Sequence, residues 1–214
     1  MEFLFTVKLA GLPLIEVAAF VLGVGNLWLI VRQNIWNWPV GLALVTLYFW
    51  IFGYQRIYAS MGLQVFFFAL QIYGWYQWLH GGAGGGARTV TRLDARLARV
   101  LLGISAAGTA ALAVLLVHTA DPAPIPDSAA TVLSLAAQWM MARKILEHWL
   151  VWIAVDVLTI GFSLYTGLYP TAALYTVFLV LCVRGFGEWR RTLPAPGPPT
   201  PAMGPEGLGR EPGR

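Results

Sequence analysis

Amide side chains interrupt a long apolar segment of the chain and are the first candidates for chemistry. Gln64 and Gln71 are seven residues apart within 57–79, so they fall on one stripe of a helix, which Phe68 and Trp75 share. Polar side chains within a membrane usually face the interior of a helix bundle or a cavity. The stripe predicts a pore-lining face, where aromatic planes stack on a flat ring and amides bond its edge. A packing seam, with the amides bonded to neighbouring helices, is the alternative.

A carboxyl group lies in a later apolar segment, 148–166. Trp149, Trp152 and Asp156 follow the spacing W-x2-W-x3-D, which places all three on one helix face. A charge at this depth is costly unless it is paired, so Asp156 is a candidate substrate ligand, with Trp152 beside it. An internal hydrogen-bond anchor is the alternative for Asp156. We expect Trp149, like Trp78 of the earlier segment, to lie in the aromatic belt at the membrane interface.

Three further polar residues lie near the ends of apolar segments. Asn37 opens the segment 36–53, and Gly41 one turn later leaves room beside it. Glu16 lies near the start of the first apolar segment, where we favour a structural role. Arg184 lies near the end of the last segment, where its long side chain can snorkel to the interface.

The sequence lacks the residues that most other chemistries require. Its single cysteine, Cys182, excludes a disulfide framework and a cysteine metal site, and its three histidines are far apart, as expected of helix-end residues. It has no Walker lysine, no G-x-S-x-G and no H-E-x-x-H. We therefore expect no catalytic residue, no metal and no cofactor. The net charge of +4 does not indicate nucleic-acid binding, because the basic residues lie between apolar runs.

The composition is that of a protein embedded in a lipid bilayer. Hydrophobic residues make up 58% of the chain, charged residues only 11%, and the mean hydropathy is +0.66. About 25% of residues are charged in a soluble domain, so we predict an all-α polytopic membrane protein. A spanning helix needs about 20 mostly apolar residues. The predicted helices span about 13–31, 36–53, 57–79, 98–118, 128–142, 148–166 and 169–189.

Proline, glycine and basic residues mark the ends of these helices. The proline-rich stretch 121–127 is predicted to be non-helical, and it closes the fourth helix. Residues 1–193 form the predicted transmembrane domain, and 194–214 form a tail predicted to be disordered. Lys and Arg gather in the loops on one side, which the positive-inside rule makes cytoplasmic. The N-terminus is then outside, and the tail is cytoplasmic.

The chain matches itself at an offset of 111 residues. Trp38 pairs with Trp149, Gly74 with Gly185 and Trp78 with Trp189, without a gap. The first three helices (about 13–79) therefore repeat as the last three (about 128–189), with 98–118 as a linker helix. Because a shift of four helices preserves orientation, the repeats are parallel. This predicts the 3+1+3 arrangement of the SWEET transporters, with a substrate site between the repeats near mid-membrane.

The sequence resembles the PnuC family of bacterial nicotinamide riboside transporters over residues 13–190. The likeness rests on motifs that occur in family order and at family spacing. They are Tyr58-Ala59-Ser60, Leu63-Gln64-Val65-Phe66-Phe67-Phe68, Ile72-Tyr73-Gly74-Trp75, Trp78, Arg143-Lys144, Glu147, Trp149-x-x-Trp152, Asp156, Gly167-x-Tyr169, Gly185 and Trp189.

The resemblance implies an inner-membrane vitamin uniporter with seven helices in a 3+1+3 arrangement, assembled as a homotrimer. Import is expected to be facilitated diffusion, followed by trapping through a cytoplasmic kinase. Carried onto this chain, with Trp75 added from the aromatic stripe, the expected substrate-binding residues are Asn37, Gln64, Gln71, Trp75, Trp152, Asp156 and Tyr175. Another flat cationic vitamin, thiamine first, is the alternative substrate. An intramembrane enzyme using Glu16 and Asp156, and a structural membrane subunit, are distant alternatives.

Overall fold

A computed structural model describes residues 8–9, 12–119 and 124–194, apart from a few side chains that include Glu16. The predicted tail and the role of Glu16 thus lie outside the described part of the chain. The described residues are mostly helical, and a short antiparallel pair, β1 (Lys8–Leu9) and β2 (Leu12–Pro13), precedes the helices. The helices are α2 (Leu14–Val31), α3 (Asn37–Tyr54), α4 (Tyr58–His80), η1 (Ala83–Gly85), α5 (Ala95–Val117), α6 (Pro124–Ala142), α7 (His148–Tyr165) and α8 (Tyr169–Arg191).

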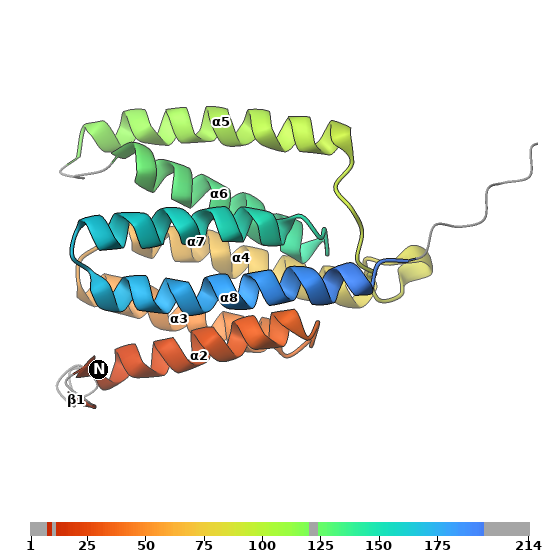
Figure 1. The fold of residues 1–214 in the computed structure, drawn as a ribbon, viewed down its shortest axis with the longest axis horizontal. Coiled ribbons are helices and arrows are strands. Elements are labelled where there is room, and N and C mark those ends of the chain that lie inside the picture. The colour runs from red at the N-terminus through yellow and green to blue at the C-terminus, as the bar shows by residue number, and fades with distance from the viewer. Residues whose placement is uncertain (1–7, 10–11, 120–123, 195–214) are drawn as a thin grey trace, which may run out of the picture.

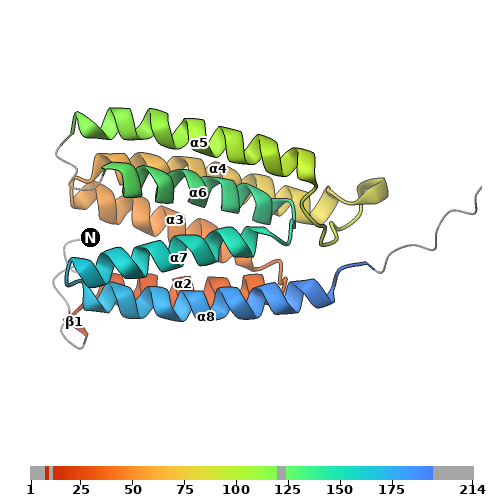
Figure 2. The same ribbon diagram turned by 45° about the horizontal axis from the view of Figure 1, so that its top comes forward.

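The seven α-helices lie side by side along one long axis and alternate in direction (Figures 1 and 2). Helices α2, α4, α6 and α8 all finish at the same end of the bundle. We call this the basic end, because Arg32, Arg143, Lys144, Arg190 and Arg191 lie there. The all-α prediction is confirmed, and the helix boundaries differ from the predicted ones by a few residues.

The largest boundary difference is at the start of α6. We predicted that 121–127 would be non-helical, but α6 begins at Pro124. Proline is tolerated in the first helical turn, where its missing N–H would have no partner and its fixed φ already suits the helix. The hydroxyl of Ser128 donates to the carbonyl of Pro124 at 2.6 Å and closes this turn.

Three helices, α5, α7 and α8, are long and apolar enough to cross a membrane by length and composition, and Val17–Val31 of α2 is a shorter apolar stretch. The remaining helices, α3, α4 and α6, carry tryptophan, tyrosine, proline or amide side chains among their apolar residues. These side chains lower the mean hydropathy, so the seven-span topology stays a prediction.

The turns repeat at the offset of 111 residues. Gln33 and Lys144 both have positive φ, 52° and 50°, in the turns after α2 and α6. Arg56 (φ 61°) and Gly167 (φ 76°) correspond in the same way, before α4 and α8. Positive φ is uncommon for residues other than glycine. Its recurrence at equivalent positions supports the duplication read from the sequence.

Each half also contains the same tryptophan–glycine contact. A Cβ atom on Gly74 would overlap the indole of Trp38, and a Cβ on Gly185 would overlap the indole of Trp149. Trp38 and Trp149 are completely buried. Glycine at these positions lets an indole from the preceding helix pack directly on the helix backbone.

Two tryptophans predicted for the interface belt lie in the core instead. Trp149 packs on Gly185, and Trp78 is 3% exposed. The indole N–H of Trp78 donates to the carbonyl of Met141 at 3.2 Å. The prediction was wrong because it placed these residues by distance from a helix end, whereas helices that pack tightly at the basic end bury them.

Candidate functional site

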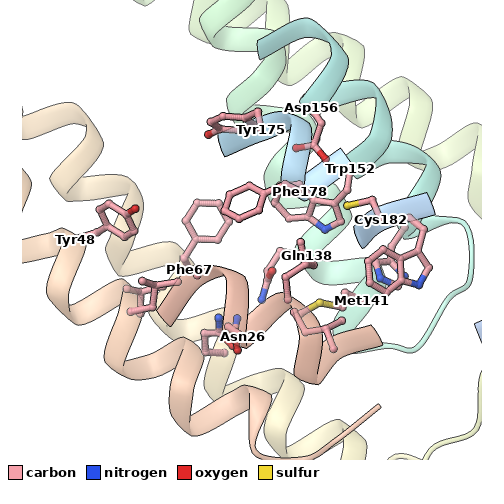
Figure 3. Close-up of a pocket in the computed structure, with 18 of the residues that line it drawn as sticks. Asn26, Tyr48, Phe67, Gln138, Met141, Trp152, Asp156, Tyr175, Phe178 and Cys182 are labelled. Carbon is pink, nitrogen blue, oxygen red and sulfur yellow. The ribbon is translucent and has the colours of Figure 1, made fainter. Parts of the chain in front are cut away.

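A cavity of about 280 Å³ lies among helices α2, α3, α4, α6, α7 and α8. Figure 3 shows part of its lining, with aromatic and polar side chains converging from several helices. Its described lining residues are Gly23, Asn26, Leu27, Ile30, Leu44, Val45, Tyr48, Gln64, Phe67, Gln71, Gln138, Met141, His148, Trp149, Trp152, Asp156, Tyr175, Phe178 and Cys182.

The two amides predicted from α4 both reach this cavity. Gln71 is buried, and it crosses the backbone of α3 at Gly41. A Cβ atom on Gly41 would lie 2.7 Å from Cδ of Gln71 and 2.5 Å from its Nε2. Gly41 therefore makes room for the amide of Gln71, whereas the sequence suggested that it makes room beside Asn37.

The structure also brings Trp152, Asp156 and Tyr175 to the cavity. Asp156 is 3% exposed, and its Oδ2 has no hydrogen-bond partner in the described structure. The phenol of Tyr175 lies at the position of α8 that corresponds to Gln64 of α4. The cavity is thus lined by matching positions of the two halves, and those positions carry different chemistry.

Asn37 and Trp75 are absent from the described lining. Asn37 is buried at the start of α3, where its Nδ2 donates to the carbonyl of Asn34 at 2.6 Å. Trp75 is 36% exposed on the surface of the bundle. Seven residues rotate a helix by about 700°, so Gln71 lies about 20° from Gln64, and Trp75, four residues further on, is rotated by about 40° from Gln71. The spacing therefore puts all of them on one stripe, but the amides line the cavity, whereas the stripe aromatics Phe68 and Trp75 are exposed.

The lining residues that were not predicted from the sequence include three with amide or imidazole side chains: Asn26 of α2, Gln138 of α6 and His148 of α7. Asn26 and Gln138 are lone amides in apolar helices, which is the pattern that identified Gln64 and Gln71. His148 occupies the position that corresponds to Asn37, and its Nδ1 bonds the carbonyl of Ile145 at 2.7 Å. The repeat offset would have grouped His148 with the candidate Asn37.

Among the lining atoms that are buried without a hydrogen-bond partner, acceptors outnumber donors. The Nδ1 of His148 faces a carbonyl oxygen and carries the proton, which leaves Nε2 of the neutral ring as an acceptor. An unpaired buried polar group costs about 1–3 kcal/mol, so a ligand that supplies the missing donors is favoured. The unpartnered acceptors of the lining are Asn26 Oδ1, Gln71 Oε1, His148 Nε2 and Asp156 Oδ2, and the unpartnered donors are Gln138 Nε2 and Trp149 Nε1.

The described lining carries no positive side chain, and its charge depends on one carboxyl group. None of the described lining residues is a lysine or an arginine, and Asp156 is the only acid among them. Within the described residues, no group of three or more His, Cys, Asp or Glu side chains could hold a metal ion. The lining therefore suits a flat ligand that is cationic or neutral and rich in N–H and O–H groups.

Further cationic side chains lie at the basic end of the bundle, outside the described lining of the cavity. Nε of Arg88 donates to the carbonyl of Arg143 at 2.6 Å, and its pKa is lowered by burial first and by the charge of Arg143 second. Nζ of Lys144 lies 4.4 Å from the ring centroid of Trp78, and burial lowers its pKa. This hydrogen bond from Arg88 joins the segment before α5 to the turn between α6 and α7.

Comparison with known proteins gives consistent matches along the chain. A sequence profile described as "Nicotinamide mononucleotide transporter" matches residues 13–191. The nicotinamide riboside transporter PnuC of Escherichia coli (strain K12) is 28% identical over 201 residues, covering 82% of this chain and 84% of its own. The riboflavin/roseoflavin transporter RibM of Streptomyces davaonensis is 30% identical over 173 residues, covering 79% and 81%.

A solved structure shares the fold. The crystal structure of the vitamin B3 transporter PnuC superposes on this chain with a TM-score of 0.67 at 24% identity. The superposition covers 83% of this chain and 81% of the other. The helix arrangement described above is therefore that of a known membrane transporter.

Proposed function

Because this chain belongs to the nicotinamide mononucleotide transporter family, we propose that it carries nicotinamide riboside across the bacterial inner membrane by facilitated diffusion. Relatives in this family are named nicotinamide riboside transporters. The observation that carries the proposal is the cavity between the two halves, which is aromatic, rich in acceptors and holds one carboxyl group. Transport needs no catalytic group, and none is assigned.

The chemistry of nicotinamide riboside matches this lining. Its pyridinium ring is flat and positively charged, so it stacks on the indole of Trp152 and is attracted by the carboxylate of Asp156. Its ribose hydroxyls and carboxamide N–H groups supply donors to Gln71 and His148. The phenol of Tyr175 and the amide of Gln64 lie at matching positions of the two halves, and both line the cavity.

The same lining favours the riboside over its mononucleotide. A phosphate group brings two negative charges and only acceptors, and proteins bind it through Arg, Lys or backbone N–H groups. The described lining has no Lys or Arg and carries Asp156. Phosphorylation by a cytoplasmic kinase would therefore convert the cargo into a molecule that this cavity rejects, which traps it inside the cell.

Riboflavin is the second candidate, because the Streptomyces relative is named as a riboflavin transporter. The cavity volume argues against it. Sites for drug-sized ligands span roughly 300–1,000 Å³, and the 280 Å³ found here lies at the lower limit of that range. A single-ring nucleoside fits this volume better than the three fused rings of a flavin. Thiamine, also flat and cationic, is the remaining alternative.

The proposal includes the 3+1+3 architecture, with α2–α4 and α6–α8 as parallel repeats and α5 as the linker. It is supported by the equivalent turns, the equivalent tryptophan–glycine contacts and the position of the cavity between the two halves. Alternating access then consists of one repeat rocking against the other around the bound ligand. Weak, reversible binding suits such a carrier.

The proposal also covers orientation and assembly, and features of the surface support both. The basic end is placed in the cytoplasm by the positive-inside rule, which puts the N-terminus outside. No residue of α5, all of which is described, is buried, and α5 packs chiefly against α6. A large apolar face is thus left to lipid or to another subunit, which agrees with a homotrimer.

A side-by-side binding titration tests the substrate. Purified protein is titrated with nicotinamide riboside, its mononucleotide, riboflavin and thiamine under the same conditions. We expect saturable binding of the riboside, and binding of the mononucleotide at least tenfold weaker. Tighter binding of riboflavin or thiamine than of the riboside would reject the proposed cargo.

A further inference from the structure

Two arginines from different helices share one tryptophan at the basic end. The guanidinium carbon of Arg32, just after α2, lies 5.3 Å from the ring centroid of Trp28. The guanidinium carbon of Arg184, in α8, lies 5.6 Å from the same centroid. Both arginines and Trp28 are exposed on the surface of the bundle. Two positive charges are therefore held close together where α2 packs against α8.

Neither charge is neutralised within the described part of the chain. The salt bridge found there joins Arg191 to Glu188, and neither Arg32 nor Arg184 has an acidic side chain within salt-bridge distance. Arg32 follows the C-terminal end of α2, where the helix dipole favours a cation. Arg184 lies two turns before the end of α8, so the dipole gives it no comparable stabilisation.

The other half of the chain provides a comparison. Arg143 lies 5.1 Å from the ring centroid of Trp139, as Arg32 does from Trp28. The position that corresponds to Arg184 is Tyr73. The contact shared by the two halves thus contains one arginine, and a second arginine contacts Trp28 on the α2–α8 side. A charge that neither packing nor the repeat explains is a candidate for ligand binding.

We propose that Arg32, Trp28 and Arg184 form a binding site for the phosphate headgroup of an anionic phospholipid such as phosphatidylglycerol. An arginine at a lipid-facing position is stabilised when its guanidinium meets a headgroup phosphate, and guanidinium forks match phosphate geometry. Tryptophan prefers the same headgroup depth. Because both guanidinium groups contact the same indole, the two charges and the ring form one local site at the surface. This site lies on the outer surface of the bundle and is separate from the proposed cargo cavity.

Lipid retention tests the site directly. The full chain is purified in neutral detergent doped with phosphatidylglycerol and phosphatidylcholine, and bound lipid is quantified by mass spectrometry. Each basic residue near an anionic lipid surface contributes affinity of about fivefold, so Arg184→Gln and Arg32→Gln should each weaken phosphatidylglycerol binding by about that factor. Arg184→Lys should retain part of the binding, because it keeps the charge but loses the guanidinium fork. Arg143→Gln, which removes the matching arginine of the other half, should leave it unchanged.

Three outcomes would overturn the proposal. The first is phosphatidylglycerol binding by both Arg184→Gln and Arg32→Gln at the wild-type level. The second is an equal loss in Arg143→Gln, which would indicate a general effect of surface charge. The third is displacement of the lipid by inorganic phosphate, which would assign the site to a free anion. Size-exclusion profiles show which variants are folded. If one of the two arginine variants is not folded, the other tests the proposal alone.

Discussion

Trp78 and Trp189 meet at the basic end with their ring centroids 5.8 Å apart, and each bonds the opposite half of the chain. Trp78 Nε1 donates to the carbonyl of Met141 at 3.2 Å, and Trp189 Nε1 donates to the carbonyl of Ile30 at 3.0 Å. Both donors and both acceptors are related by the same offset of 111 residues. Since Ile30 and Met141 also line the cavity, this reciprocal pair closes its basic end.

The reciprocal pair predicts matched losses of stability. Trp78→Phe and Trp189→Phe each leave one buried carbonyl without its donor, which costs about 1–3 kcal/mol. We expect both variants to lower the unfolding free energy in detergent by similar amounts. Trp36→Phe, at a tryptophan that is 65% exposed, is the control and should change it little. A large loss in one indole variant and none in the other would contradict the symmetric role.

Asp156 is predicted to set the preference for a cationic ligand. Asp156→Asn keeps the shape of the side chain and removes its charge, so we expect the affinity for nicotinamide riboside to fall about tenfold or more. The protein should stay folded, because a buried carboxylate with an unpartnered Oδ2 is costly and the amide is not charged. Isothermal calorimetry measures the change, with Glu188→Gln at the surface as the control. Unchanged affinity in Asp156→Asn would remove Asp156 from the site.

Gly41 is predicted to control the position of Gln71. An alanine methyl group at position 41 would lie within 2.8 Å of three atoms of the Gln71 amide, so the amide must move. We expect Gly41→Ala to weaken riboside binding about tenfold while helix stability is kept or raised, since alanine is the better helix former. Gly25→Ala is the matched control, because nothing lies within 4 Å of a Cβ there. Equal affinities in the two variants would contradict the role of Gln71.

Trp152 and Trp75 are predicted to respond differently to the same change. Trp152 lines the cavity, whereas Trp75 lies on the surface of the bundle. Trp152→Leu should therefore lose the stacking contribution, about 1–3 kcal/mol of binding energy, and Trp75→Leu should bind the riboside like the wild type. Parallel titrations of the two variants make the comparison. Weaker binding in Trp75→Leu would contradict this difference and support the prediction from the sequence that Trp75 belongs to the binding face of α4.

Helix positions and the duplication could be predicted from the sequence, because both depend on the spacing of apolar residues and tryptophans along the chain. It was harder to predict which individual side chains point into the cavity and which point outward. Gln64 and Gln71, grouped by their spacing of seven, both line the cavity. Trp75 lies outside the described lining, because neighbouring helices decide how wide the buried face of α4 is. Asn37 also lies outside it, because its amide bonds the turn before its own helix.

Residues that act through tertiary contacts left little trace in the sequence. The role of Gly41 depends on Gln71 crossing α3, which no local pattern reveals. Nε2 of His148 is an acceptor in a fixed position only because Nδ1 is hydrogen-bonded to the carbonyl of Ile145. Trp149 and Trp189 also pack against the ring and hold it in place. Such features arise from packing between helices, so no local pattern of residues reveals them.

Uptake by proteoliposomes tests most directly whether this chain is a carrier of nicotinamide riboside. Purified protein is reconstituted without an ion gradient, and the entry of labelled riboside is followed with and without unlabelled riboside preloaded inside. We predict uptake that equilibrates without an ion gradient, is accelerated by the preloaded riboside and is lost in Asp156→Asn. Uptake no faster than in protein-free liposomes, with or without preloading, would contradict the account.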